Sequence, residues 1–280
     1  MGASKKTRSD WKWKVGKQTD NTRLGMRYEP GNWGDMLKGT WGVTVGQAAS
    51  MLLNRKPVRY LDPFAGAPTY ALTESATQRM RDLSTTELAR HASPFVAKSE
   101  WPSTALLIRS ACEEHGSSTP MRVFDADSKR RNAWAGIPDT EICKSTTGEA
   151  ILASACKEEA PCELILVDPY DFLAEWKTLL NPVLQLSERI GVLCYIYNRA
   201  PRSVGHLNLY KQFRKALDEG LADRKFLLGR LASDERLPRA YHEMLLLGPY
   251  TWISTLREPL LEQTLRLARR LAEAGAFEEA

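Results

Sequence analysis

The sequence predicts an α/β fold built on one mostly parallel sheet of seven strands. Two short runs rich in apolar and branched residues, 58–63 and 163–169, each end in Asp-Pro. Buried parallel strands have this pattern, because helices cover both of their faces. Helical patterns alternate with further strand patterns along the chain, which favours βαβ units. The 280 residues with 43% hydrophobic content are enough for one large globular domain.

The predicted elements follow in chain order. Residues 1–24 are expected to form a flexible basic arm, and residues 25–280 the folded domain. Apolar positions at helical spacing predict a helix over 35–54, with Asp35 as its candidate N-cap. Residues 70–118, interrupted by Pro94 and Pro102, predict a helical insertion after the first strand. An amphipathic helix is expected over 256–275. The strands are expected at 59–62, 121–125, 140–143, 164–167, 189–197, 225–231 and 243–247.

The amino-terminal arm combines basic and aromatic residues. The net charge of the whole chain is +5, which permits a polyanionic partner. Within the arm, Trp11, Lys12, Trp13 and Lys14 are consecutive. Lysines bind phosphates and tryptophans stack on unpaired bases, so these residues are candidates for contact with nucleic acid, RNA in particular. The alternative is a solvated tail that serves only solubility.

Cysteine, histidine and hydropathy patterns exclude several classes of protein. The five cysteines lack the spacing of a zinc site, and the four histidines are scattered, so no metal site is expected. No apolar stretch is long enough to span a membrane, and the charged amino terminus lacks the apolar core of a signal peptide. These features predict a reduced, cytoplasmic protein. The oligomeric state stays open.

Acidic residues stand at the predicted carboxyl ends of three strands, where open α/β sheets bind their ligands. Asp62 opens a turn that includes Phe64 and Gly66, and the glycine lets a ligand approach the backbone. Asp125 ends the second strand, where a carboxylate suits the two hydroxyls of a ribose. The alternative for Asp125 is a cap of the next helix.

The fourth strand ends in Asp168-Pro-Tyr-Asp171. A carboxylate at this place can accept an amine proton, and Tyr170 can stack on a base. The alternative is an ordinary turn between a strand and a loop. Before the first strand, Asp35 and Lys38 are three positions apart, a spacing that is most often a pair on a helix surface.

The order of these segments resembles the bacterial 23S ribosomal RNA adenine-N6 methyltransferases, from about Gly31 to the carboxyl terminus. Residues 31–38, Gly-Asn-Trp-Gly-Asp-Met-Leu-Lys, are similar to the family's Gly-Asn-His-Ala-Asp-Val-Leu-Lys. Residues 60–67 resemble Tyr-Leu-Asp-Thr-His-Ala-Gly-Ala, and residues 101–104 resemble its Tyr-Pro-Gly-Ser-Pro segment. Residues 164–170 resemble Leu-Ile-Leu-Ile-Asp-Pro-Pro-Tyr, and residues 244–252 resemble the terminal strand with its Asn-Pro-Pro-Trp end.

The resemblance implies a Rossmann-like fold that uses S-adenosylmethionine, with a helical insertion after the first strand. It implies catalytic roles for Lys38, Asp168 and Tyr170, with Asp168 holding the target amine. The implied cofactor-binding residues are Lys38, Asp62, Phe64, Gly66, Ser103, Asp125 and Asp168.

The chain departs from the family pattern at named positions. Gly39 and Phe64 replace family histidines, and Asp-Pro-Pro-Tyr is replaced by Asp168-Pro-Tyr-Asp171. Asp171 thus occupies the place of the aromatic residue, and Phe172 is a candidate substitute for it.

Three functions stay open at this point. The first is a methyltransferase acting on RNA, with an rRNA adenine amine as the candidate target. The second is a methyltransferase of the same ancestry acting on DNA or a small molecule. The third is an inactive protein that binds nucleic acid or the cofactor. The altered loop favours the second and third, whereas the basic arm favours a nucleic-acid acceptor.

Overall fold

The structure is a computed structural model that describes residues 14–15, 21–22, 29–159, 161–232, 240–270 and 276–279. Its elements outside the main sheet include a strand pair, β4 with β5, and a second short pair, β1 with β2. The helices are α1 (Trp33–Leu52), α2 (Glu74–Asp82), α3 (Glu87–Val96), α4 (Thr104–Glu114), α5 (Ser128–Asn132), α6 (Gly148–Ala155), α7 (Phe172–Ser187), α8 (Val204–Leu221) and α9 (Tyr250–Arg270), with 3₁₀ turns η3 (Ala133–Gly136) and η4 (Ala200–Arg202). The short strands are β1 (Lys14–Val15), β2 (Asn21–Thr22), β4 (Thr69–Ala71) and β5 (Glu100–Pro102).

The main sheet has eight strands in the order β12-β10-β11-β9-β8-β3-β6-β7. The strands from β9 to β7 are all parallel to one another, whereas β11 is antiparallel to both β9 and β10, and β12 is antiparallel to β10. The strands are β3 (Tyr60–Asp62), β6 (Met121–Val123), β7 (Thr140–Ile142), β8 (Leu164–Val167), β9 (Gly191–Asn198), β10 (Leu227–Ala232), β11 (Tyr241–Leu247) and β12 (Ala276–Glu279).

The predicted fold class is confirmed. All seven expected strands form, and β12 extends the sheet at one edge. From β3 the chain steps outward to β6 and β7, then returns to the other side of β3 with β8 and β9. This reversal is the switch point of a doubly wound sheet, beside which such folds bind their ligands. The antiparallel β11, inserted between β9 and β10, completes the Rossmann-like sheet.

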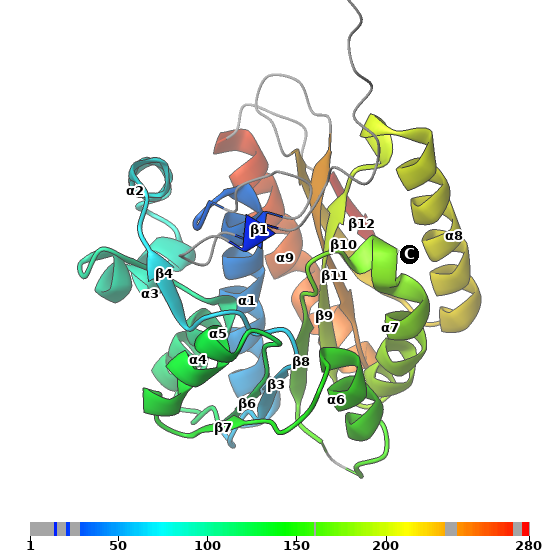
Figure 1. Ribbon diagram of the computed structural model, residues 1–280, viewed down its shortest axis with the longest axis horizontal. Helices are drawn as coiled ribbons and strands as arrows, with labels where there is room; N and C mark the ends of the chain where they lie inside the picture. The colour runs from blue at the N-terminus through cyan, green and yellow to red at the C-terminus, as the bar shows by residue number, and fades with distance from the viewer. Residues whose placement is uncertain are drawn as a thin grey trace, which may run out of the picture.

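Helices cover both faces of the sheet. Helices α1, α4 and α9 lie on one side, and α6, α7 and α8 on the other (Figure 1). Successive residues of β8 alternate between the two cores, since Leu164 and Leu166 pack in one and Ile165 and Val167 in the other. The period of two in strand geometry produces this alternation. It explains why the buried strands are continuous apolar runs in the sequence.

Helix α1 begins two residues earlier than expected. Asn32 is its N-cap, because its side-chain oxygen accepts a hydrogen bond from the Asp35 amide at 3.1 Å. The expectation that Asp35 is the cap is wrong. Asp35 instead lies in the first turn, where its Oδ2 accepts from the Gly31 amide at 2.8 Å. The two side chains together satisfy donors at the helix start, which fixes the position of Lys38 one turn later.

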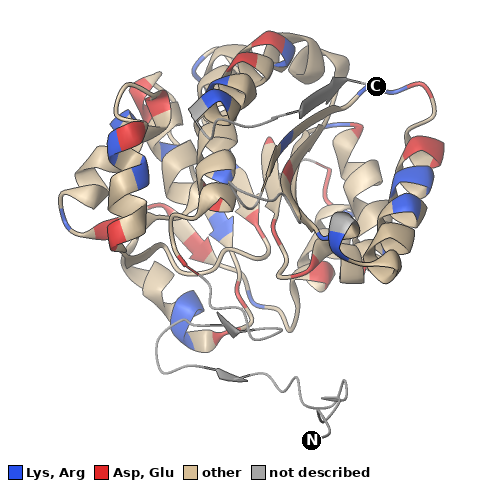
Figure 2. Cartoon of the chain, turned by 90° about the horizontal axis from the view of Figure 1, so that it is seen from above, with Lys and Arg blue, Asp and Glu red and all other residues tan. Residues whose placement is uncertain are grey.

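The outer helices carry charges of both signs (Figure 2). On α8, Arg214 pairs with Asp218 and Lys215 with Glu219, each four residues apart. Such exposed pairs stabilise a helix only slightly. In the part of the chain that the structure describes, no helix is long and apolar enough to cross a membrane. All five cysteines are free thiols.

Candidate active site

The largest concentration of predicted site residues lies in one cavity of about 720 Å³. It opens at the carboxyl ends of β3, β6 and β8, where Asp62, Asp125 and Asp168 follow apolar strand residues. Its size falls within the range of small-molecule and cofactor sites. The predicted residues that line it are Lys38, Asp62, Phe64, Gly66, Ser103, Asp125, Asp168 and Tyr170. Trp11, Lys12, Trp13 and the side chain of Lys14 lie outside the described residues.

Lys38 and two carboxylates form a partly buried ionic network in this cavity. Lys38 Nζ lies 2.8 Å from Asp168 Oδ2 and 3.1 Å from Asp35 Oδ1. Burial opposes the charge on Lys38, but the neighbouring carboxylates outweigh it and raise the pKa of the amine well above its usual range. The interpretation of Asp35 and Lys38 as a surface pair is therefore wrong: α1 packs its first turns into the site, and their side chains are only 6% and 12% exposed.

Asp168 is held by Lys38 but is not strongly acidic. Burial raises the pKa of Asp168 to about 6, although Lys38 acts in the opposite direction. The carboxylate is thus mainly ionised at neutral pH and keeps its second oxygen for another donor. A group with a pKa near the working pH that faces a cavity is suited to proton handling.

Asp62 lies beneath the cavity and is 2% exposed. It accepts hydrogen bonds from the Tyr60 hydroxyl at 3.0 Å and from the Phe64 amide at 3.1 Å. Burial raises the pKa of Asp62 to about 7. Its hydrogen bond to the Phe64 amide fixes the turn that follows β3, so Asp62 shapes the cavity wall through the backbone.

The turn after β3 requires glycine at position 66. Gly66 has a φ of 64°, and a Cβ at this position would lie 2.2 Å from the Tyr70 hydroxyl oxygen. Its carbonyl accepts from Trp134 Nε1 at 2.9 Å, and its amide donates to Asp125 Oδ2 at 3.1 Å. The backbone of Gly66 therefore forms part of the cavity wall, and its amide is hydrogen-bonded to the Asp125 carboxylate.

Asp125, after the end of β6, holds the neighbouring backbone in place through its carboxylate. Its Oδ1 accepts from the Asp127 amide at 2.7 Å, and Arg130 Nε lies 3.5 Å from the same oxygen. Burial raises its pKa, although Arg130 favours the charged form. The helix cap is Asp127, which accepts from the first amides of α5, so the alternative role of Asp125 as a cap is wrong. Each oxygen of Asp125 retains acceptor capacity toward the cavity.

Ser103 joins the cavity through the start of α4. Its hydroxyl caps the helix by accepting from the Leu106 amide at 3.4 Å, and its own amide donates to the Pro68 carbonyl at 2.8 Å. The helix amino terminus and Ser103 thus face the cavity together, which suits a negatively charged ligand group.

In the divergent loop after β8, Tyr170, Asp171 and Phe172 have three different roles. Tyr170 is 40% exposed and lines the cavity. Asp171 caps α7, since its Oδ1 accepts from the Ala174 amide at 3.2 Å, and it lies 3.9 Å from Arg199 Nη2. Phe172 is 2% exposed and packs edge-on against Phe213, with ring centroids 5.4 Å apart. The expectation that Phe172 replaces the missing aromatic is wrong, because its ring belongs to the core; Tyr170 is the loop's aromatic in the cavity.

An aromatic wall of the cavity, formed by Tyr195, Tyr197 and His242, was not identified from the sequence. Tyr195 and Tyr197 lie on one face of β9, and His242 on β11 stacks on both rings, at centroid distances of 6.1 and 5.2 Å. Tyr195 Oη and His242 Nδ1 are 2.7 Å apart. Burial lowers the pKa of His242 to about 4, so the imidazole is neutral. The Tyr-x-Tyr spacing at the end of a strand is the signal that places both rings on one face.

A group of potential metal ligands lies outside the cavity. Glu87 and His91 on α3 and Glu114 on α4 bring ligand atoms within 4.8 Å of one another. The sequence interpretation overlooked it, although Glu87 precedes His91 by one helical turn. Arg90 contacts both carboxylates, so its guanidinium supplies the positive charge in this group.

No protein-family model matches this sequence, and no curated protein matches it. Among solved structures, protein LPL1258 from Legionella pneumophila is 16% identical with a TM-score of 0.62, over 90% of this chain and 98% of that chain. This likeness shows a shared fold and nothing of a shared activity. Lower TM-scores link the chain to an rRNA methylase from Streptococcus thermophilus (0.36, 11% identity, 72% and 93% coverage) and to fibrillarin from Methanococcus jannaschii (0.36, 8% identity, 69% and 67% coverage).

Proposed function

We propose that this protein is an S-adenosylmethionine-dependent methyltransferase that acts on RNA, at an exocyclic amine such as N6 of an rRNA adenine. The observation that carries the proposal is the convergence of Asp62, Asp125 and Asp168 from three neighbouring strand ends on one cavity, with Lys38 paired to Asp168. The basic sequence of residues 1–24 supports a polyanionic acceptor.

The residues of the cavity fit the chemistry of this cofactor. Asp125 offers acceptor oxygens for a ribose, and the Gly66 turn leaves room for a ligand against bare backbone. The carboxylate of Asp168, which is mainly ionised at neutral pH, favours a cationic sulfonium over a neutral group. When bound, S-adenosylmethionine supplies an electrophilic methyl group attached to that sulfonium.

The role proposed for Asp168 follows from its two oxygens and its pKa. Lys38 binds Oδ2, which orients the carboxylate and leaves Oδ1 to accept a hydrogen bond from the acceptor amine. With the amine so held, the bound cofactor would supply its methyl carbon to the amine lone pair, and the electrons of the carbon–sulfur bond that breaks would remain on sulfur. The proton that the amine then loses passes to Asp168 or to water. The protein contributes positioning and a path for this proton.

Tyr170 is proposed to stack on the target base, because it is the exposed aromatic beside Asp168. Tyr195, Tyr197 and His242 line the same cavity, and Lys38 Nζ lies 4.5 Å from the centroid of the Tyr195 ring. A planar base held between aromatic groups presents its edge, and therefore its amine, to Asp168.

The test is methyl transfer from isotopically labelled S-adenosylmethionine to total RNA, to DNA and to a metabolite extract. We expect label in RNA, with N6-methyladenosine found by nucleoside mass spectrometry. Asp168→Ala should lower turnover by about 100-fold or more, whereas Asp168→Asn, which keeps an acceptor oxygen, should retain more activity. Asp223→Ala, at an exposed aspartate outside the cavity, is the matched control.

Each other outcome has a defined meaning. Label in DNA or in small molecules alone would replace RNA as the acceptor. Cofactor binding without transfer to any extract would identify a binding protein without catalysis. Full turnover in Asp168→Ala would refute the role of the carboxylate.

A further inference from the structure

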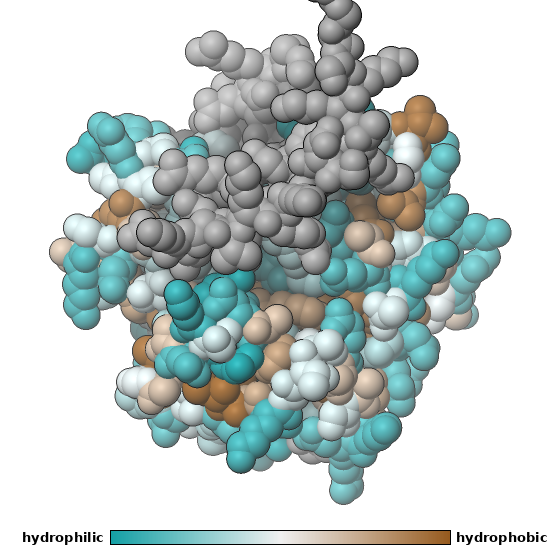
Figure 3. Space-filling model, in the orientation of Figure 1, coloured by the Kyte–Doolittle hydropathy of each residue, from teal (hydrophilic) through white to brown (hydrophobic). Residues whose placement is uncertain are grey.

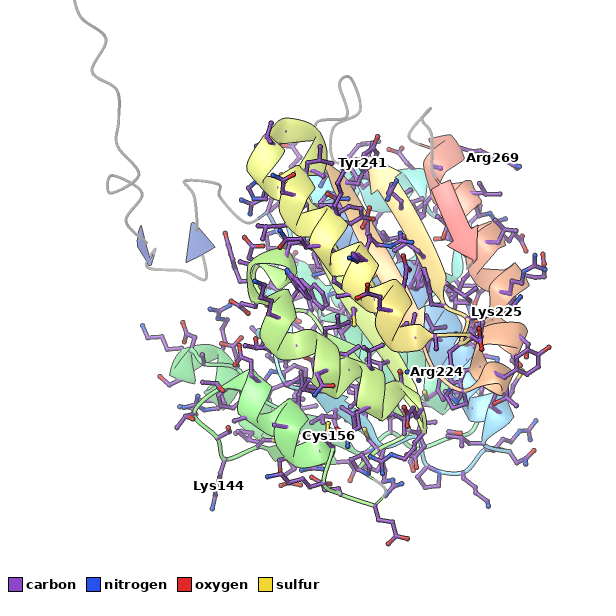
Figure 4. All side chains as sticks on the ribbon, turned by 90° about the vertical axis from the view of Figure 1, so that its right-hand side faces the viewer. Lys144, Cys156, Arg224, Lys225, Tyr241 and Arg269 are labelled. Atoms are coloured by element: carbon purple, nitrogen blue, oxygen red, sulfur yellow. The ribbon has the colours of Figure 1, made fainter. Side chains whose placement is uncertain are left out.

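A second cavity, of about 580 Å³, lies beside the first at the end of β9. Its walls come from β9, η4, the start of α8 and the facing ends of β10 and β11. Tyr241, which marks its inner side, lies near the upper end of the sheet next to α8 (Figure 4). The residues that line the cavity are Asn198, Ala200, Arg202, Ser203, Val204, Leu207, Tyr210, Arg230 and Tyr241.

The two cavities share one stretch of chain. Tyr197 and Arg199 line the first cavity, whereas their neighbours Asn198 and Ala200 line the second. Side chains alternate along a strand, so Tyr197 and Asn198 face opposite sides of β9, and the two cavities meet around the carboxyl end of that strand. A polymer that crosses this strand end contacts both. The second cavity is therefore placed to bind the monomer of a polymeric substrate that is next to the monomer reacting in the first cavity.

The inner side of the second cavity carries a fixed pair of planar groups. The Arg230 guanidinium lies over the Tyr241 ring, 5.0 Å from its centroid. Arg230 Nε donates to buried Glu243 at 2.6 Å, and Nη2 donates to the Tyr210 hydroxyl at 3.0 Å. Because these bonds immobilise the guanidinium, the pair is a preorganised stacking surface.

The rim of the second cavity combines a cation with apolar groups. Arg202 is exposed and forms no ion pair with any residue that the structure describes. Val204 is 74% exposed and Leu207 is 37% exposed. Figure 3 shows apolar surface on the side of the molecule where α8 begins. Glu243 compensates the charge of Arg230, so Arg202 is the rim cation left for an anion.

We propose that this second cavity binds the unpaired nucleotide next to the target base of a single-stranded RNA, with its base on the Tyr241–Arg230 pair and its phosphate on Arg202. The proposal rests on the proposed function of the first cavity. Stacking needs a free base face, which a paired and stacked duplex does not present. It follows that the acceptor is a loop or other single-stranded segment.

The test measures fluorescence anisotropy of a short labelled oligoadenylate RNA, alone and annealed to its complement. Tyr241→Ala should weaken binding of the single strand by about 5- to 150-fold, the range for one lost base stack. Tyr241→Phe keeps the ring and should bind as wild type does. Arg202→Ala should weaken binding and lower the dependence of log affinity on log salt by about one unit.

The matched control is Arg269→Ala, which removes one exposed positive charge from α9 (Figure 4). It should leave single-strand affinity within twofold of wild type. Calorimetry with S-adenosylmethionine should give the same affinity for wild type, Tyr241→Ala and Arg202→Ala. Wild-type single-strand affinity in both Tyr241→Ala and Arg202→Ala, or equal affinity of wild type for duplex, would overturn the inference. If Tyr241-dependent RNA binding occurs without cofactor binding or methyl transfer, the subsite stands and the proposed function fails.

Discussion

Lys38 Nζ and Asp168 Oδ2 form a 2.8 Å ion pair between residues 130 positions apart in the sequence. The pair ties the first turns of α1 to the end of β8, so the helix that precedes the sheet contributes directly to the cavity. It also orients the carboxylate to which we assign the acceptor amine. The chemistry proposed for this protein depends on that geometry.

The rate of methyl transfer should rise with pH through about 6. Burial raises the pKa of Asp168 to about 6, so acidification protonates the oxygen that must accept from the amine. Activity should therefore fall below that pH and level off above it. The check is the pH profile of kcat/KM for wild type and Asp168→Asn. The variant should show a lower rate without this inflection, and an inflection retained in Asp168→Asn would assign the titration to another group.

Asp62→Asn should become progressively more stable relative to wild type as the pH rises. Burial raises the pKa of Asp62 in the folded state to about 7, above its ordinary value of 3.8. The folded state thus keeps a proton that the unfolded chain releases, and wild-type stability decreases as pH rises from about 4 to 7. Asparagine has no such titration, so the difference in unfolding free energy should shift toward the variant by up to about 4 kcal/mol. Urea unfolding at pH 5 and pH 8 without cofactor should show about 3 kcal/mol of this shift, because the unfolded carboxyl is already ionised at pH 5. An equal difference at both pH values would contradict it.

Tyr170→Ala and Phe172→Ala should have opposite effects on activity and stability. Tyr170 is exposed in the cavity, so its loss should change the unfolding free energy by no more than about 0.5 kcal/mol. It should raise the KM for RNA by about 5- to 150-fold. Phe172 is buried against Phe213, and its truncation should cost about 3–5 kcal/mol of stability. Thermal denaturation and steady-state kinetics separate the two, and a Tyr170→Ala enzyme with unchanged KM would exclude the stacking role.

The sheet could be predicted from the sequence because the residue patterns that identify strands are local. Continuous apolar runs such as 164–167 identify buried strands, and an aspartate at the end of each run marks the ligand-binding edge. The strand over Ala276–Glu279 has no such pattern and was not expected. Local sequence patterns do not reveal contacts between segments that are distant in the chain. The spacing of Asp35 and Lys38 predicted a pair on a helix surface, because no residue near them in the sequence indicates that Asp168 lies beside them in the fold.

The aromatic wall was missed for a related reason. Tyr195 alternates with apolar neighbours within β9, and this pattern is also that of a core strand. His242 lies far along the chain, and only the pairing of β11 with β9 brings the two side chains together. In the divergent loop, sequence position suggested Phe172 as the aromatic. The helical start at Phe172 turns that side chain into the core and makes Asp171 a cap.

Deletion of residues 1–24 should weaken RNA binding and leave cofactor binding unchanged. The lysines and arginines of this segment release counterions when they meet phosphates, so its contribution should decrease with salt. Binding of total RNA at several salt concentrations, with calorimetry of the cofactor as the control, measures both effects. If affinity and salt slope match those of the full chain, the segment is a solvated tail.

Calorimetric titration of S-adenosylmethionine into the full-length protein and into Asp125→Ala tests the central claim most directly. Two charge-assisted hydrogen bonds from a ribose to a buried carboxylate should contribute on the order of 2–3 kcal/mol. We therefore expect wild type to bind and Asp125→Ala to bind about 30- to 150-fold more weakly, with both proteins folded by circular dichroism. Absence of binding to wild type at millimolar cofactor would contradict the account of this cavity.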